Sequence, residues 1–254
     1  MIDTHSHMYS EQFNEDRAAA INRSQQQGIE FILLPNIDVD SIEALHSLAD
    51  TQKNCLPMMG LHPCSVDENV IKSLSIIKHE LFNNHRKYIA VGEIGIDLYW
   101  DQTFLKQQQE AFNTQIRWAK EYELPIVIHC RDAFDEVFEI LEDHRGEGLS
   151  GIFHCFTGTK DQADRAIDLN LKLGIGGVVT FKNGKIDQFL DQISPDHIVL
   201  ETDAPYLAPV PFRGKRNQSE YLVHILQKLA LIYRRSVSEI ATITSKNALS
   251  VFKI

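Results

Sequence analysis

The sequence predicts an α/β protein, a single (β/α)8 TIM barrel over residues 1–254 with extra C-terminal helices. Eight short apolar runs alternate with longer amphipathic stretches, as expected for strands that are each followed by a helix. No Gly/Ser-rich linker divides the chain, and 254 residues is an ordinary length for one such barrel. An open doubly wound sheet is the alternative, but no G-x-G-x-x-G or G-x-x-x-x-G-K-[ST] motif opens a predicted helix.

The predicted strands are the short apolar runs, each five to seven residues long. They lie at residues 1–7, 30–35, 56–60, 88–94, 124–129, 151–156, 171–176 and 197–201. The longer amphipathic stretches between and after them predict helices. These lie at residues 15–27, 41–53, 69–82, 104–122, 133–143, 161–169 and 183–192, and then at 220–233, 237–244 and 245–252.

The composition indicates an ordinary soluble globular protein, with 43% hydrophobic and 24% charged residues. No apolar run approaches the roughly 18 to 20 residues that span a membrane, and no signal-peptide pattern opens the chain. We therefore expect a cytoplasmic protein with no membrane partner, and nothing in the sequence indicates an obligate protein partner. The four cysteines lack C-x-x-C spacing, which argues against a zinc knuckle or a disulfide scaffold.

Histidines and carboxylates gather at the ends of the predicted strands, where active sites of this fold are built. In the first strand, alternation would place Asp3, His5 and His7 on one face, so that both imidazoles bind one cation. A lone imidazole after an apolar run is more often a packed core histidine. Several at equivalent strand ends, together with carboxylates, indicate metal ligands. The predicted ligands are His5, His7, Glu93, His129, His154 and Asp203, with Asp97 beyond Glu93.

The size of this donor set predicts two divalent cations rather than one. The donors exceed the three protein ligands that a catalytic metal usually has. Two cations that share a bridging carboxylate fit the set better. Four imidazoles suit Zn²⁺, Mn²⁺ or Ni²⁺ better than Mg²⁺, which prefers oxygen donors, and the choice among these ions stays open.

Further polar residues are predicted to support the site. Asp3 and Glu201 would lie one layer deeper in the barrel, where a carboxylate accepts the second ring N–H of a ligating histidine or pairs with Arg131. A buried ion pair without influence on the metals is the alternative. His62 lies on the rim, where we expect it to contact a substrate phosphate rather than a metal. The other histidines are expected to be structural or solvated: His46, His79, His85, His144, His197 and His224.

Basic and aromatic residues on the loops after the strands predict a rim that binds nucleic acid. Guanidinium and ammonium groups contact phosphates, and aromatic rings stack on unpaired bases for roughly 1 to 3 kcal/mol per base. This combination favours single-stranded ends, and a merely solvated loop is the alternative. The net charge of −10 argues against polyanion binding by the whole surface, so local cations are required. The residues are Tyr99, Trp100, Phe181, Lys182, Tyr206, Phe212, Arg213, Lys215 and Arg216.

Eight motifs follow one another along the chain: DTHSH, GLHP, VGEIGIDLYW, IHCRDAF, FHCFTG, GIGG, ETDAPYL and PFRGKRN. Their order and spacing resemble the TatD family of metal-dependent deoxyribonucleases over nearly the whole chain. The resemblance implies an amidohydrolase-like TIM barrel that carries two divalent metals. In this family pattern His5, His7 and Asp203 would hold one metal, His129 and His154 the other, and Glu93 would bridge them. Leu98 replaces an aromatic residue usual in the family, at the substrate rim rather than at a ligand.

The predicted function is hydrolysis of phosphodiester bonds in DNA, with RNA as a further substrate. A water activated by two metals would attack, Asp203 would orient it or take its proton, and Glu93 is the second catalytic residue. Arg131 would neutralise charge on the phosphoryl oxygens. The resemblance implies digestion of single-stranded ends from the 3′ side. The alternative is hydrolysis of a carboxylic ester, lactone or amide, for example in D-aminoacyl-tRNA, and a binding barrel without catalysis is the third hypothesis.

Overall fold

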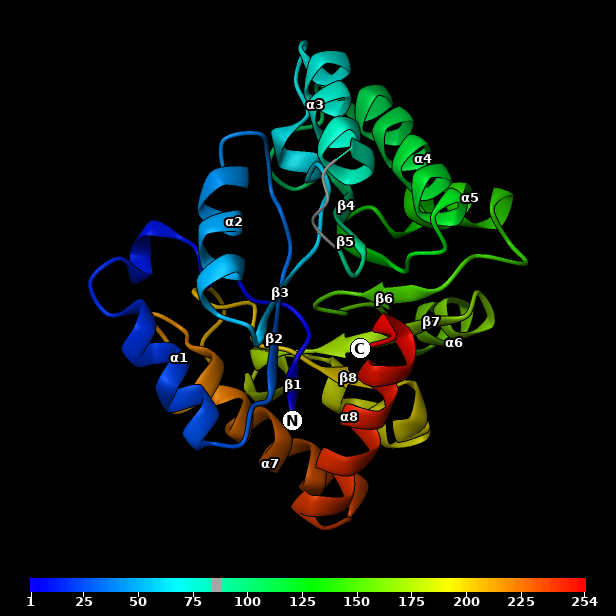
Figure 1. The fold of residues 1–254 in the computed structure, drawn as a ribbon. Helices are drawn as coiled ribbons and strands as arrows, with labels where there is room; N and C mark the ends of the chain where they lie inside the picture. The colour runs from blue at the N-terminus through cyan, green and yellow to red at the C-terminus, as the bar shows by residue number, and fades with distance from the viewer. Residues whose placement is uncertain (84–87) are drawn as a thin grey trace.

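The computed structural model describes residues 1–83 and 88–254 of the chain. These residues form eight strands, and the pairings between neighbouring strands are parallel. Figure 1 shows the strands at the centre of the molecule with the helices around them. The strands are β1 (Ile2–Asp3), β2 (Phe31–Leu34), β3 (Cys55–Pro57), β4 (Val91–Asp97), β5 (Ile126–Arg131), β6 (Gly151–Phe153), β7 (Leu171–Ile175) and β8 (Ile198–Leu200).

The eight strands close into a barrel. Strands β1, β2 and β3 pair in sequence order, and so do strands β4 to β8. Short parallel bridges join the two groups, one between Ser6 and Ala204 and the other between Met59 and Val91. Closure removes the exposed sheet edges, and the predicted (β/α)8 TIM barrel is confirmed.

Helices follow the strands and form the outer layer of the barrel (Figure 1). Among the described residues, none of these helices combines the length and the apolar character that crossing a membrane requires. The helices are α1 (Arg17–Gln26), α2 (Ile42–Thr51), α3 (Val70–Asn83), α4 (Leu105–Glu121), α5 (Phe134–Asp143), α6 (Lys160–Asp168), α7 (Leu222–Tyr233) and α8 (Val237–Phe252).

Two helix predictions are wrong. The segment predicted as one helix at 183–192 forms two 3-10 turns, Ile186–Gln188 and Leu190–Gln192. Phe189 between them has a φ of −134°, outside the helical range, so the helix is interrupted there. The segments predicted as two helices at 237–244 and 245–252 form the single helix α8, because no glycine or proline breaks the sequence between them.

The interior of the barrel is filled with apolar side chains and is closed at one end by α8. Leu33, Val127 and Val199, which lie on three different strands, form a buried cluster with Ala248 and Phe252 of α8. A second, larger apolar cluster occupies the layer between the strands and the helices. Helix α8 therefore covers the end of the barrel where the strands begin, and polar residues gather at the other end.

Alternation along three strands brings polar side chains into the interior at the carboxyl end of the barrel. Side chains two residues apart on a strand share a face, so an inward apolar residue predicts an inward side chain two positions later. In β5, and just beyond the ends of β6 and β8, that second side chain is polar. The pairs are Val127 with His129, Ile152 with His154, and Val199 with Glu201.

Candidate metal centre

One group of donors surrounds a single carboxylate oxygen of Glu93. His5 Nε2 lies 3.0 Å from Glu93 Oε2, and His7 Nε2 lies 3.8 Å from the same oxygen. Asp203 approaches this group from the loop after β8, with Oδ1 3.4 Å from His7 Nε2 and 4.0 Å from His5 Nε2. Two imidazoles and two carboxylates thus converge on one small volume.

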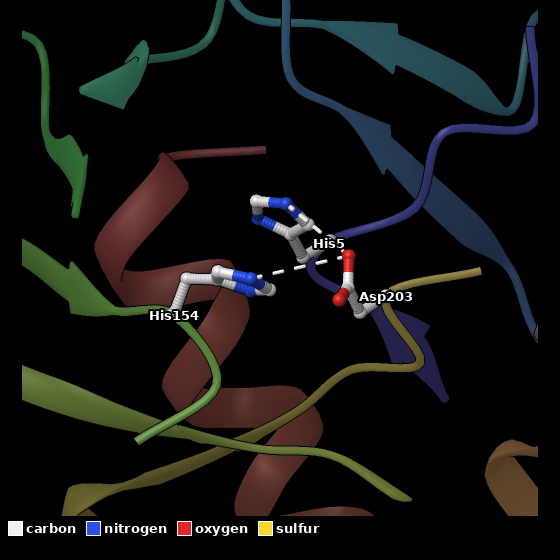
Figure 2. Close-up of side chains that lie close together, drawn as sticks. All are labelled: His5, His154 and Asp203. Carbon is white, nitrogen blue, oxygen red and sulfur yellow. Dashed lines mark ion pairs between the residues drawn. The ribbon is translucent and has the colours of Figure 1, made fainter. Parts of the chain in front are cut away.

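A second group of donors faces the other oxygen of Glu93. His129 Nδ1 lies 2.9 Å from Glu93 Oε1, and His154 Nε2 lies 3.8 Å from it. His62 Nε2 is 3.4 Å from the same oxygen. Asp203 closes the arrangement, since its Oδ1 is 3.9 Å from His154 Nε2, and Figure 2 shows it turned toward the imidazole rings. All six predicted ligands therefore lie together, and Glu93 stands between two donor groups. We call these six residues the cage.

The donor chemistry of the cage fits a divalent cation. Within the described part of the chain, Nδ1 of the buried His5 has no hydrogen-bond partner. A buried polar atom left in this way is costly unless a ligand satisfies it. Ligand atoms of His5, His154 and Asp203 lie within 4.8 Å of one another, as do those of His5, His7 and Glu93. Imidazole and carboxylate together are the donors that Zn²⁺ and Mn²⁺ bind.

Electrostatics in the cage favour a bound cation. Burial alone would raise the pKa of Glu93, but His5, His62 and His154 hold it well below its usual value, so the carboxylate stays ionised. Burial would lower the pKa of His154, but Glu201 and Glu93 outweigh it and raise that pKa to about 10. Without a cation, the ring of His154 is therefore protonated at neutral pH. Binding of a cation would displace this proton.

The carboxylate of Glu201 contacts the ring of His154. Its Oε1 lies 3.0 Å from His154 Nδ1 and accepts a hydrogen bond of 2.6 Å from the Cys155 amide. The glutamate side chain is completely buried and fits against Gly174, where a Cβ atom would lie 2.2 Å from Oε2. The absence of a side chain at Gly174 thus makes room for the carboxylate that orients His154.

Gly174→Ala is expected to weaken cation binding about 10- to 100-fold, the usual effect of losing a partner behind a metal ligand. The added methyl group would push Glu201 away from His154. Gly176→Ala is the matched control, because its Cβ would lie 3.5 Å from Glu201 Oε1, an ordinary contact. Cation titrations of the two variants and the wild type measure the effect. Equal affinities in all three proteins would contradict this role of Glu201.

Two further side chains, Tyr9 and Asp97, contact other histidines of the cage. The Tyr9 hydroxyl lies 3.1 Å from His7 Nδ1 and donates to the Pro35 carbonyl at 2.7 Å. Asp97 Oδ2 lies 2.8 Å from His129 Nε2, and its other oxygen accepts two backbone amides of the loop after β4. A signal existed for both: Tyr9 continues the two-residue spacing of the N-terminal histidines, and Asp97 ends the strand that carries the bridging glutamate.

Asp3 and Arg131 differ from their predicted contacts. Asp3 accepts hydrogen bonds from the Thr202 amide at 2.9 Å and the Thr202 hydroxyl at 2.7 Å, so it binds neither a histidine ring nor Arg131. The reason is that β1 ends at Asp3, and strand alternation does not continue into the histidines. Arg131 places its guanidinium 3.7 Å from the centre of the Tyr99 ring. It therefore belongs to the rim and not to the layer below the cage.

The basic side chains of the loop after β8 have two different surroundings. Arg213 is exposed and lies over the Phe181 ring at 3.6 Å, and Lys215 is also exposed. Arg216 instead forms two contacts with the Asp16 carboxylate, at 2.7 and 2.8 Å. Arg216 thus fastens the loop to the start of α1 and is not available as a phosphate contact, contrary to the prediction from the basic cluster.

Tyr206 connects this loop to the cage. Its ring centre lies 6.0 Å from that of His7, and the side chain is half exposed. The buried Asn217 side chain donates to the carbonyls of Thr202 and Tyr206, at 2.7 and 2.6 Å. These bonds hold the base of the loop against the end of β8, so its aromatic and basic residues border the mouth of the barrel.

Other histidines lie outside the cage. His46 Nε2 is 2.7 Å from the Tyr88 hydroxyl, and His144 Nε2 is 2.6 Å from Asn113 Oδ1. These contacts join neighbouring helices and loops and agree with the structural role expected of them. His85 lies outside the described residues.

Comparison with known proteins identifies the family. A model of the family described as TatD related DNase matches residues 2–253. The chain belongs to the TatD family. Members of the TatD family include metal-dependent hydrolases, and this chain is accordingly a metal-dependent hydrolase with His/Glu/Asp clusters capable of binding a metal.

Individual TatD-family relatives match along their whole length. YabD of Bacillus subtilis (strain 168), a metal-dependent hydrolase, is 36% identical over 255 residues, covering 100% of this chain and 99% of YabD. The 3′-5′ ssDNA/RNA exonuclease TatD of Pantoea vagans is 29% identical and is covered completely. The crystal structure of YjjV, a TatD homologue from Escherichia coli K12, has a TM-score of 0.94 at 29% identity, covering 100% of this chain and 98% of YjjV.

Proposed function

We propose that this protein is a nuclease that hydrolyses phosphodiester bonds of DNA and RNA from single-stranded 3′ ends. The observation that carries the proposal is the position of Glu93, whose two oxygens face two different groups of imidazoles. Such a bridging carboxylate is typical of two-metal phosphodiester hydrolysis. The end-to-end similarity to the Pantoea vagans exonuclease supports the substrate class.

In this proposal the cage holds two divalent cations, with Zn²⁺, Mn²⁺ and Mg²⁺ as the candidates. His5, His7 and Asp203 would hold one, His129 and His154 the other, and Glu93 would contact both. Bound there, the cations would lower the pKa of a water molecule and neutralise charge on the phosphoryl group.

Asp203 is the residue that we propose to orient the attacking water and take its proton. Burial raises its pKa, but His7, His154 and His5 outweigh burial and lower the pKa below its usual value. The carboxylate is therefore ionised at neutral pH and can accept a proton. Its backbone has a φ of 57°, a conformation uncommon outside glycine, and its amide donates to the His5 carbonyl at 2.9 Å. These features aim the carboxylate into the cage.

The rim supplies contacts for a single strand on two sides of the cage. On one side Arg131 covers Tyr99, which is half exposed. On the other side Arg213 covers Phe181, with Lys215 nearby in the same loop. Each pair presents a cation for phosphate and an aromatic face for an unpaired base. A small neutral substrate would not need this set, which favours nucleic acid over a carboxylic ester or amide.

Arg213→Ala and Lys215→Ala are each expected to weaken binding of a single-stranded oligonucleotide and to make binding less dependent on salt. Each lost phosphate contact should reduce the slope of log K against log salt by about 0.7. Binding is measured by fluorescence anisotropy in EDTA, so that the oligonucleotide is not cleaved. Lys246→Ala, at an exposed position of α8 at the far end of the barrel, is the control and should leave the slope unchanged. Slopes equal to that of wild type would exclude both residues from the binding surface.

Hydrolysis itself is tested with oligonucleotides labelled at either end. The protein is incubated with single-stranded and duplex substrates in Mg²⁺, Mn²⁺ or Zn²⁺, and then with EDTA. We expect a 5′-labelled single strand to shorten stepwise, duplex to be cut more slowly, and EDTA to stop both reactions. Intact oligonucleotides together with cleavage of a carboxylic ester, a lactone or D-aminoacyl-tRNA would replace this proposal with the alternative hydrolase.

A further inference from the structure

The hydrogen-bond partners of the site histidines determine the tautomer of each ring, that is, which ring nitrogen carries the proton when the ring is neutral. The Tyr9 hydroxyl donates to the Pro35 carbonyl, so it can only accept from His7 Nδ1. His7 therefore carries its proton on Nδ1, and the lone pair of Nε2 faces Asp203 at 3.4 Å. A histidine held in this way is prepared to bind a cation through Nε2.

His154 is oriented in a similar way. Its Nδ1 lies 3.0 Å from the Glu201 carboxylate. Its Nε2 is the atom that faces Glu93 and Asp203. His7 and His154 thus direct the same nitrogen, Nε2, into the cage.

His62 is held in the opposite form. Its Nδ1 accepts a hydrogen bond of 3.1 Å from the Cys64 amide, so Nδ1 has no proton. The proton of the neutral ring then lies on Nε2, the atom that faces the cage 3.4 Å from Glu93 Oε1. A ring that accepts a hydrogen bond at Nδ1 is neutral, because both nitrogens of a charged imidazole carry protons. An Nε2 that carries a proton has no lone pair to offer a cation.

His62 is also placed where a ligand can reach it. Its side chain is 12% exposed, at the border between the cage and the rim, and its ring stands edge-on to His129 with centres 4.4 Å apart. The 3.4 Å distance to Glu93 is longer than the roughly 2.9 to 3.0 Å of an ordinary N–H···O bond, so an oxygen of a bound substrate can replace Glu93 as the acceptor of this N–H group.

We propose that His62 is a catalytic residue that donates a hydrogen bond from Nε2 to a non-bridging oxygen of the scissile phosphate. This role rests on the proposed function of the cage. A neutral imidazole is an effective donor because it gives direction to a hydrogen bond without losing its proton. Charge grows on the phosphoryl oxygens during hydrolysis, so a fixed donor stabilises the transition state more than the ground state.

Two substitutions separate this role from that of a metal ligand. His62→Asn retains an oxygen that can accept from the Cys64 amide but does not reach the Nε2 position, whereas His62→Gln extends an N–H donor toward it. We expect kcat/KM on a single-stranded oligonucleotide to fall about 10²- to 10³-fold in His62→Asn, the usual effect of losing one such donor. His62→Gln should recover at least about tenfold of this loss.

Cation affinity and spectroscopy provide readouts that do not depend on activity. Titration with Mn²⁺ should give the same affinity for both variants as for wild type. Long-range ¹H–¹⁵N spectra of the metal-loaded protein should show His62 with its proton on Nε2. Lower Mn²⁺ affinity in His62→Asn, unchanged kcat/KM, or a His62 proton on Nδ1 would each overturn the proposal.

The same variants distinguish this proposal from the function on which it rests. Wild-type protein that cleaves no oligonucleotide but hydrolyses a carboxylic ester or amide would refute the nuclease. The donor role would then be measured on that substrate, where charge also grows on an oxygen. A fall in kcat/KM for His62→Asn with recovery in His62→Gln would support the donor, and equal rates would overturn it.

Discussion

Glu93→Gln is expected to abolish hydrolysis and cation binding together. The glutamine side chain has nearly the same shape but only one oxygen, so it cannot present an anionic oxygen to each donor group. Glu93 is 2% exposed, so the solvent cannot compensate for the lost negative charge beside the bound cations. We expect activity to fall by more than about 10³-fold, because losing even one fixed donor costs about 10²- to 10³-fold. Elemental analysis after loading should show loss of bound metal.

The control for this substitution is Glu110→Gln, the same chemical change on the exposed face of α4. It should bind metal and hydrolyse oligonucleotides as the wild type does. Circular dichroism of both variants should show the barrel intact, since the replaced side chain is close in volume. A Glu93→Gln protein that binds as much metal as wild type would refute the bridging role.

Asp203→Asn is expected to separate cation binding from hydrolysis. Asparagine tolerates the left-handed backbone at this position and retains an oxygen that can face a cation, but it cannot take a proton. General base catalysis contributes about 10²- to 10⁴-fold, so kcat at saturating metal should fall by that factor. Single-turnover assays with the metal-loaded variant measure the fall. Asp143→Asn, at the exposed end of α5, is the control.

Full hydrolysis by metal-loaded Asp203→Asn would remove this carboxylate from the proton transfer. Loss of bound metal at saturating concentrations would instead show that Asp203 acts mainly as a ligand. Measuring metal content and kcat on the same preparation distinguishes the two results.

The barrel and the inward direction of its strand-end histidines on β5 and β6 could be predicted because strand alternation reports them. In β5, His129 follows two residues after a core valine, and the same spacing places His154 after β6. The prediction depended only on local spacing and on the rule that parallel strands end at the same side of a barrel. Long-range pairing then brings together residues that are far apart in the sequence.

Contacts outside the regular strands could not be predicted in this way. Asp3 binds Thr202 because β1 is only two residues long, and its neighbours follow an irregular path. The Cys155 amide reaches Glu201 from a backbone with a φ of 43°, a conformation that spacing rules do not report. The pairing of Arg216 with Asp16 joins two loops about two hundred positions apart, and local sequence contains no sign of it.

Helix α8 limits how a polymer can pass through this molecule. Phe252 and Ala248 fill the amino end of the barrel, so a strand cannot be threaded from one side to the other. In the proposed reaction, a trimmed nucleotide would leave through the same opening by which the terminus arrived. The shortened chain would then shift forward or dissociate before the next cut, and the number of nucleotides removed in one encounter would report which of these steps is faster.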